Sequence, residues 1–256
     1  MAPSSLEEAL ALRAEHGDEA TVLAGGTFLG ILMNQGFLAP SAFLSLGGVE
    51  ELRELSVVDG ELRLGAMVTH RRVEREVEGW PVLARAFGLV ASPRVRNVAT
   101  VGGVLADADY ASDPPAMLAA LGARAVLRSP RGEREVSVGE LILGFYETCI
   151  EPDELLVEVR VPAEPAKATY RKFRSRSCED RPCAAVAAVR GERLRVVVGA
   201  VAETPQDFPD LCDGAPEEVA AGYAERIEPL SDSRGSAAYR RRVIAAEVRR
   251  AVEAVS

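Results

Sequence analysis

Apolar and polar positions along this chain alternate with two periodicities, one typical of strands and one typical of helices. Ser5, with a glutamate three residues later, forms a capping-box pattern that predicts the start of a first helix. The apolar run 21–23 predicts a strand, 28–33 a helix and 42–46 a second strand. Because a helix between two strands forms a crossover, we expect residues 1 to about 55 to make a small α/β unit.

Two groups of strands are predicted in the middle of the chain. Residues 54–66 form two strand-like runs joined by Asp59-Gly60, a pair that tolerates the positive φ of a tight hairpin. Residues 123–162 predict a strand, an Arg131-Gly132 turn, a second strand, a short helix and a third strand. The proline-containing segment 162–165 then predicts a linker.

Helices are predicted between these strands and again near the C-terminus. Asp113 as N-cap, followed by two prolines, predicts a helix that continues through Leu121. The last predicted helix, 236–255, carries one apolar stripe. We therefore expect residues 164–256 to form an α+β domain. The other predicted helices are 71–77, 82–90 and 216–227, and a further hairpin pairs 184–189 with 194–200.

Charge and hydropathy exclude several classes of partner. The net charge of −9 argues against nucleic acid or an anionic membrane, because both bind basic surfaces. No apolar segment is long enough to span a bilayer, and the N-terminal residues lack an export-signal pattern, so we expect a cytoplasmic protein. The arginine-rich segments are predicted to be solvated faces. They contain Arg171, Arg174, Arg176 and Arg240 to Arg242.

The cysteines and histidines do not predict a metal site. The cysteines are scattered without a C-x-x-C pair, so we expect reduced structural thiols. They are Cys149, Cys178, Cys183 and Cys212. His16 and His70 are each predicted to lie on the surface, and no nucleophile–base–orienter set is recognisable. Redox chemistry in this chain would therefore have to come from a bound cofactor.

Two glycine-rich turns carry the candidate chemistry. The stretch TVLAGGTFLGILMNQG, residues 21–36, predicts a strand, a tight turn and a helix. The first N–H groups of such a helix have no partner within it and favour an anion such as phosphate. A second turn, TVGGVLAD at 100–107, suits a second phosphate, so the pair indicates a dinucleotide. For AGGT alone, an ordinary βα turn is the favoured explanation, because short glycine-rich signals are common.

Five blocks of sequence resemble the FAD-binding medium subunit of the molybdenum hydroxylases, the xanthine dehydrogenase and aerobic carbon monoxide dehydrogenase family. In order, they are AGGTFLGILMNQG, SPRVRNVATVGGVLADADYASDPPAMLAALGA, FYETCIEPDELLVEVRVP, YRKF and DSRGSAAYRRRV. The resemblance implies an α+β fold. It places a two-part FAD-binding domain of the p-cresol methylhydroxylase/vanillyl-alcohol oxidase type at 1–163, divided near residue 55, and a carbon monoxide dehydrogenase flavoprotein-type C-terminal domain at 164–256.

The resemblance also implies partners. In that family this subunit passes electrons from iron–sulfur clusters on a small subunit to NAD, a quinone or oxygen. The substrate reacts on a molybdopterin-binding large subunit. A heterotrimer, sometimes doubled, is therefore the expected assembly.

The same resemblance implies which residues bind FAD. Residues 23–30 would wrap the pyrophosphate, with the Thr27 hydroxyl as an added donor. Lys172 would place a positive charge near the N1–C2 carbonyl end of the flavin. The implied cofactor-binding residues are Leu23, Ala24, Gly25, Gly26, Thr27, Phe28, Leu29, Gly30, Ala91, Val95, Thr100, Gly102, Gly103, Val104, Asp107, Ser112, Asp113, Leu155, Leu156 and Lys172.

Simpler roles stay open for several of these residues. Core packing accounts for Phe28 and Leu29, and an ordinary strand core accounts for Leu155 and Leu156. A solvated position accounts for Lys172.

One position departs from the family pattern. The family usually has asparagine directly after the second glycine pair, whereas this chain has Val104, which cannot form a side-chain hydrogen bond. Three functions follow: the flavin electron-transfer subunit, another flavoenzyme of the same fold such as the reductase that makes UDP-N-acetylmuramate, or a flavin-free scaffold. The DSRGSAAYRRRV block argues against the second, and Val104 keeps the third open.

Overall fold

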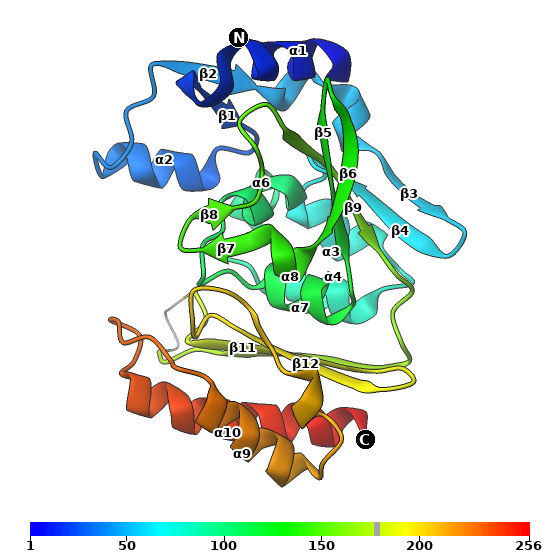
Figure 1. Cartoon of the computed structure of the whole chain (residues 1–256), viewed down its shortest axis with the longest axis vertical. Coiled ribbons are helices and arrows are strands. Elements are labelled where there is room, and N and C mark those ends of the chain that lie inside the picture. The colour runs from blue at the N-terminus through cyan, green and yellow to red at the C-terminus, as the bar shows by residue number, and fades with distance from the viewer. Residues whose placement is uncertain (177–179) are drawn as a thin grey trace.

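The chain folds into three connected parts that follow one another along the long axis of the molecule (Figure 1). The computed structural model describes residues 1–176 and 180–256. Figure 1 shows the N-terminal helix and strands at one end, a larger sheet with its helices in the middle, and a second sheet covered by two long helices at the other end. The two termini therefore lie far apart.

The N-terminal part is the predicted α/β crossover. Strands β1 and β2 pair in parallel, and α2 connects them. The Ser5 hydroxyl accepts a hydrogen bond from Glu8 N at 3.2 Å and caps α1. The Glu8 carboxylate bonds Ser4 instead of Ser5, so only half of the capping box forms. The elements are α1 (Leu6–His16), β1 (Ala20–Leu23), α2 (Thr27–Asn34) and β2 (Ala42–Ser45).

A five-stranded antiparallel sheet forms the middle part, in the order β3-β4-β9-β5-β6. The β3–β4 turn is confirmed at Asp59 and Gly60, whose φ values are 52° and 80°. The sequence pattern missed one short hairpin, formed by β7 and β8. The strands are β3 (Leu55–Val58), β4 (Glu61–Gly65), β5 (Arg124–Ser129), β6 (Gly132–Ser137), β7 (Ile142–Gly144), β8 (Glu147–Thr148) and β9 (Leu155–Val161).

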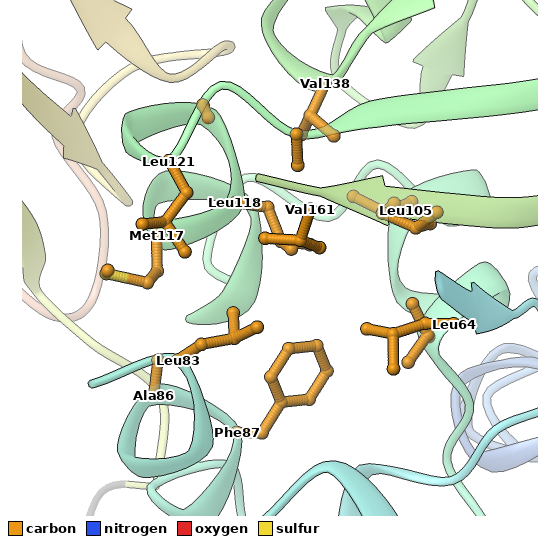
Figure 2. Packing of buried hydrophobic residues seen from close by; sticks show 14 of the residues in the cluster. Leu64, Leu83, Ala86, Phe87, Leu105, Met117, Leu118, Leu121, Val138 and Val161 are labelled. Atoms are coloured by element: carbon orange, nitrogen blue, oxygen red, sulfur yellow. The ribbon is translucent and has the colours of Figure 1, made fainter. Parts of the chain in front are cut away.

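One hydrophobic core joins this sheet to its helices. Figure 2 shows that Leu64, Phe87, Leu105, Leu118 and Val161 from five different elements gather in one cluster, and each is fully buried. Burial of such side chains contributes about 1.5–3 kcal/mol each relative to exposure. The core therefore holds α6, which contains the second glycine turn, against the sheet. The helices are α3 (His70–Glu76), α4 (Pro81–Gly88), α5 (Pro93–Arg96), α6 (Val101–Ala106), α7 (Pro114–Ala120) and α8 (Val138–Leu141).

The C-terminal part is a four-stranded antiparallel sheet, ordered β10-β11-β12-β13, covered by α9 and α10. Strand β11 is buried on both faces, because Ala185 and Val189 pack into the middle core while Val186 and Ala188 pack toward α10. This shared strand couples the two parts. The elements are β10 (Lys167–Phe173), β11 (Ala184–Arg190), β12 (Leu194–Gly199), β13 (Gln206–Asp207), α9 (Pro216–Arg226) and α10 (Ala237–Val255).

The predicted linker is a short, well-anchored connection between β9 and β10. The Glu164 carboxylate accepts hydrogen bonds from Val82 N and Leu83 N, both at 3.0 Å, and so caps α4. Trp80 Nε1 donates to Pro162 O at 2.7 Å. Among the helices of the described ranges, none has both the length and the apolar character of a membrane span. Four short 3-10 helices complete the fold: η1 (Gly17–Glu19), η2 (Leu46–Gly48), η3 (Glu50–Arg53) and η4 (Pro209–Leu211).

Arg240 corrects the prediction that the arginine-rich segments are solvated. It lies one turn before Ile244 on the buried face of α10, and its side chain is 0% exposed. Its guanidinium pairs with Asp232 at 2.7 Å and donates to Ala200 O. Asp232 also accepts a hydrogen bond from Tyr110 Oη at 2.8 Å, which ties α10 to the loop before α7. The arginines that are exposed are Arg174, Arg176, Arg241 and Arg242.

Replacement of this buried arginine is expected to destabilise the protein. Arg240→Met leaves Asp232 with one fewer partner, and breaking a buried ion pair in this way costs about 3 kcal/mol. Urea unfolding should show this loss for Arg240→Met and almost none for Arg242→Met, an exposed position on the same helix. Equal stability of the two variants would contradict the role given to Arg240.

Candidate functional site

A cleft of about 720 Å³ lies where the N-terminal part meets the middle part. Its walls come from the first glycine turn and α2, the start of α6, the loop before α7 and the start of β9. The volume is within the range of about 300–1,000 Å³ that is typical of small-molecule and cofactor sites.

Most residues that the sequence nominated line this one cleft. Segments far apart in the chain contribute, so the fold brings together what the resemblance implied. Leu23, Gly30 and Lys172 do not line it. The nominated residues that do are Ala24, Gly25, Gly26, Thr27, Phe28, Leu29, Ala91, Val95, Thr100, Gly102, Gly103, Val104, Asp107, Ser112, Asp113, Leu155 and Leu156.

The first glycine turn offers unpaired backbone donors to the cleft. Within the described residues, the N–H groups of residues 25–29 have no acceptor, and the first hydrogen bond of α2 runs from Gly30 N to Gly26 O at 2.9 Å. Gly26 has φ 67° and ψ 4°, a left-handed conformation that suits glycine and helps successive N–H groups point into one concavity. The dipole of α2 adds positive potential at the same point. This turn is built to hold an anion.

The second glycine turn works differently from the prediction. Its N–H groups are already bonded: Gly102 N donates to Ala66 O at 2.8 Å and Gly103 N to Thr100 Oγ1 at 3.1 Å. They are therefore not available to a phosphate. A Cβ added at Gly102 would lie 2.6 Å from Ala66 Cβ, so this glycine lets α6 approach β4 closely. The turn shapes the cleft wall by packing.

Asp113 does not cap α7 with its side chain, contrary to the prediction. Two prolines follow it, so the helix offers few N–H donors, and the carboxylate instead accepts from Tyr170 Oη at 2.7 Å and pairs with Lys172 Nζ at 2.8 Å. Burial raises the pKa of Asp113 to about 6, although Lys172 opposes that shift. Lys172 also donates to Leu89 O at 2.8 Å, so its ammonium is buried behind the cleft and is not solvated.

His70 is buried, which corrects its predicted surface position. The residue is 1% exposed and lines the cleft, and its ring packs edge-on against Phe87 at 4.9 Å between centroids. Because a carbonyl oxygen only accepts, the 3.1 Å contact with Thr100 O requires a proton on Nε2. Burial lowers the pKa of His70 to about 4, so the ring is neutral near pH 7. Neutral His70 thus fastens Thr100 at the start of α6.

Backbone strain and aromatic contacts gather at the edge of the cleft. Ala91 lines the cleft and has φ 42°. Ala108 and Tyr146, which are next to lining residues, have φ 44° and 57°. Such conformations cost about 1–3 kcal/mol each and are common at functional sites. The Tyr146 ring stacks on Phe28 at 5.5 Å, and the Arg181 guanidinium lies 5.9 Å from the centre of the same Phe28 ring. The first contact ties α2 to the loop between β7 and β8, and the second ties α2 to the segment before β11.

Sequence reasoning missed several charged and apolar residues of the cleft. Arg13, Met67, Asp109, Glu154 and Arg181 all line it. Arg13 Nε donates to Glu154 O at 3.3 Å, and Asp109 pairs with Arg181 at 2.7 Å. Each pair joins distant segments, so no local spacing could have revealed it. Asp109 and Glu154 lie within blocks that carried the family resemblance, but neither was nominated as a site residue.

Neither cysteines nor other ligands form a metal site in the described part of the chain, where no group of three or more candidate side chains comes together. Cys149 and Cys212 are free thiols, and Cys183 is buried with its thiol 3.6 Å from Arg234 O. Cys178 lies outside the described residues.

Comparison with known proteins identifies the family to which this chain belongs. The family described as "FAD binding domain in molybdopterin dehydrogenase" matches residues 1–164. The chain is 31% identical to caffeine dehydrogenase subunit beta of Pseudomonas sp. (strain CBB1), over 98% of this chain and 92% of that one. It is 32% identical to the carbon monoxide dehydrogenase medium chain of Hydrogenophaga pseudoflava, over 99% of this chain and 95% of that one.

Solved structures agree over the full length. A Cu,Mo-CO dehydrogenase, in its cyanide-inactivated form, has a chain that matches with a TM-score of 0.92 and 30% identity over 99% of this chain and 96% of that chain. Quinoline 2-oxidoreductase from Pseudomonas putida 86 also has a matching chain, with a TM-score of 0.89 and 33% identity over 99% of this chain and 95% of that chain. The chain belongs to the FAD-binding medium subunits of the molybdenum hydroxylases, an oxidoreductase family with an α+β fold and FAD as cofactor.

Proposed function

We propose that this chain carries electrons through FAD, from iron–sulfur clusters on a small partner subunit to NAD, a quinone or oxygen. One observation supports it most directly, the run of unpaired N–H groups at residues 25–29 in a cleft of about 720 Å³. Bound FAD supplies the electron chemistry, and the chain positions it. Substrate chemistry then belongs to a molybdopterin-binding large subunit, in a heterotrimer that we expect in the cytoplasm.

The fit of FAD to the cleft is supported at several points. Residues 25–29 would hold the pyrophosphate, because unpaired amides and a helix N-terminus both favour anions. Leu155 and Leu156 offer apolar surface to a ring system. Lys172 would influence FAD only through Asp113, since its ammonium contacts that carboxylate and does not line the cleft. Leu23 and Gly30 would support the turn from behind.

A domain boundary near residue 163 is part of the same proposal. The family match ends at residue 164, and the C-terminal helices enclose a hydrophobic cluster of their own. Residues 1–163 would then bind FAD, in two parts divided near residue 55, and residues 164–256 would support that site through β10 and β11.

Gly26→Val is expected to weaken FAD binding. A β-branched residue at a φ of 67° is strained and would redirect the neighbouring N–H groups, so the dissociation constant should rise by about tenfold or more. Gly36→Val is the matched control, because Gly36 has φ 74° and an added Cβ would meet no atom within 4 Å. Flavin fluorescence measures both, and equal affinities in the two variants would contradict the assigned phosphate site.

Electron transfer can be tested on the FAD-loaded chain alone. After anaerobic reduction by dithionite, mixing with NAD⁺, a soluble quinone or oxygen should reoxidise the flavin with at least one acceptor, as followed by its visible absorbance. Absence of reoxidation by all three would refute the transfer role. Turnover of a purine, an aldehyde or carbon monoxide by this chain alone would show that substrate chemistry is not confined to partners.

Val104→Asn tests the departure from the family pattern. Val104 lines the cleft and is partly buried, so asparagine there adds about one hydrogen bond, which changes FAD affinity by tenfold or less. We expect retained FAD and a shifted midpoint potential. Val98→Asn is the control, because Val98 is 49% exposed. If only Val104→Asn binds FAD and the unchanged chain does not, valine at this position abolishes cofactor binding.

A further inference from the structure

Three carboxylates from one short segment line the cleft, and two of them have a cationic partner. Asp109 pairs with Arg181 at 2.7 Å and accepts a hydrogen bond from Ala111 N at 3.0 Å. Asp113 pairs with Lys172 at 2.8 Å. Their negative charges are therefore compensated inside the protein.

Asp107 differs from the other two. It is partly buried at the end of α6, and within residues 1–176 and 180–256 its carboxylate has neither a hydrogen bond nor an ion pair. Its N–H donates to Gly103 O at 2.9 Å, which fixes the residue as the C-cap of α6. Ala108 follows at φ 44°, and Tyr146 N donates to its carbonyl at 3.2 Å. The chain thus maintains a strained turn directly after an uncompensated carboxylate.

The charges around Asp107 do not supply a counter-ion. The charge of Asp109, two residues further on, acts against ionisation of Asp107. Burial and then Asp109 raise the pKa of Asp107 to about 7. The cations of the cleft wall are held by other acids. The other charged and titratable residues that line the cleft are Arg13, Asp18, His70, Asp109, Asp113, Glu154, Asp180 and Arg181.

We propose that Asp107 is a redox-linked proton acceptor of the FAD site. When a one-electron donor such as an iron–sulfur protein or dithionite delivers electrons to the cofactor, the Asp107 carboxylate takes one proton from solvent and becomes a neutral carboxylic acid. On reoxidation the carboxyl returns that proton to solvent. No bond other than O–H forms or breaks in this residue. The inference rests on the proposed function, because it requires FAD in this cleft.

The physical reason is electrostatic. Added electrons make the cofactor more negative, and an ionised carboxylate in the same poorly solvated cleft disfavours that charge. Proton uptake by Asp107 removes the repulsion. An ionised Asp107 therefore lowers the midpoint potential at high pH, and a protonated Asp107 has no such effect at low pH.

Spectroelectrochemistry tests this directly by measuring the midpoint potential of FAD in Asp107→Asn and in the unchanged protein. The measurements run from about pH 5.5 to about pH 8.5, a range that brackets the pKa of Asp107. The two should coincide at the acidic end. At the alkaline end the variant should have the higher potential, because asparagine carries no charge. A one-unit redox-linked change in pKa corresponds to about a tenfold change in the ratio of affinities for reduced and oxidised FAD. Identical curves for the two proteins would overturn the proposal.

Asp59→Asn is the matched control for net charge. Asp59 lies at the β3–β4 turn with φ 52°, a conformation that asparagine adopts readily, so the fold is retained and the potential should follow the unchanged protein at every pH. If Asp107→Asn fails to hold FAD, Asp107→Ser is measured in its place. A second measurement needs no variant: reduced-minus-oxidised infrared spectra of the unchanged protein should gain a protonated carboxyl band.

The outcomes separate this inference from the proposed function. Failure of the unchanged protein to bind FAD refutes the proposed function and, with it, the role of Asp107. Two results would refute the role of Asp107 alone, provided that FAD binding and electron transfer are normal. One is the absence of the carboxyl band, and the other is a midpoint potential with the same pH dependence in the variants at position 107 as in the unchanged protein.

Discussion

The close approach of α6 to the end of β4 determines where the cleft lies. A side chain at Gly102 would collide with Ala66, and the hydrogen bond from Gly102 N to Ala66 O depends on the absence of that side chain. His70 strengthens the same joint, since its N–H bonds Ala99 O and its ring bonds Thr100 O. With α6 held in this way, its exposed side faces the first glycine turn across the cleft.

The two glycine turns therefore have different roles in the cleft. The turn at Gly26 leaves donors unpaired, which is costly inside a folded protein unless a ligand or water accepts from them. The turn at Gly102 has its donors paired and serves as a rigid wall. One side of the cleft thus offers donors that favour an anion and the other gives the cleft its shape, so two similar glycine motifs contribute differently to a single cleft.

The C-terminal part takes part in the site although it lies outside the family match. Lys172 and Tyr170 on β10 hold both oxygens of Asp113, and Arg240 on α10 holds Asp232, which in turn bonds Tyr110. Each contact joins the C-terminal sheet or helix to the segment that precedes α7. The position of that cleft wall thus depends on packing between the two parts, with β11 as the strand that both cores share.

The sequence by itself determined the local elements, and most of the residues that it nominated line the cleft. Hydrophobic periodicity located α2 and α10, turn residues located the β3–β4 hairpin, and the glycine blocks identified the two turns. These features are local, because they depend on backbone conformation and on side chains a few residues apart. Strand β10 was missed as a strand, since its alternation is weak and its pairing with β11 is what defines it.

Only the tertiary structure decided which polar groups are paired. His70, Arg240 and Lys172 belong to residue types that are usually hydrated, yet each is buried by partners that lie at least eight residues away along the chain. Asp113 occupies an N-cap position but binds β10 instead. Burial and charge compensation arise from contacts between distant segments, so a local pattern can indicate that a residue is polar but not which partner neutralises it.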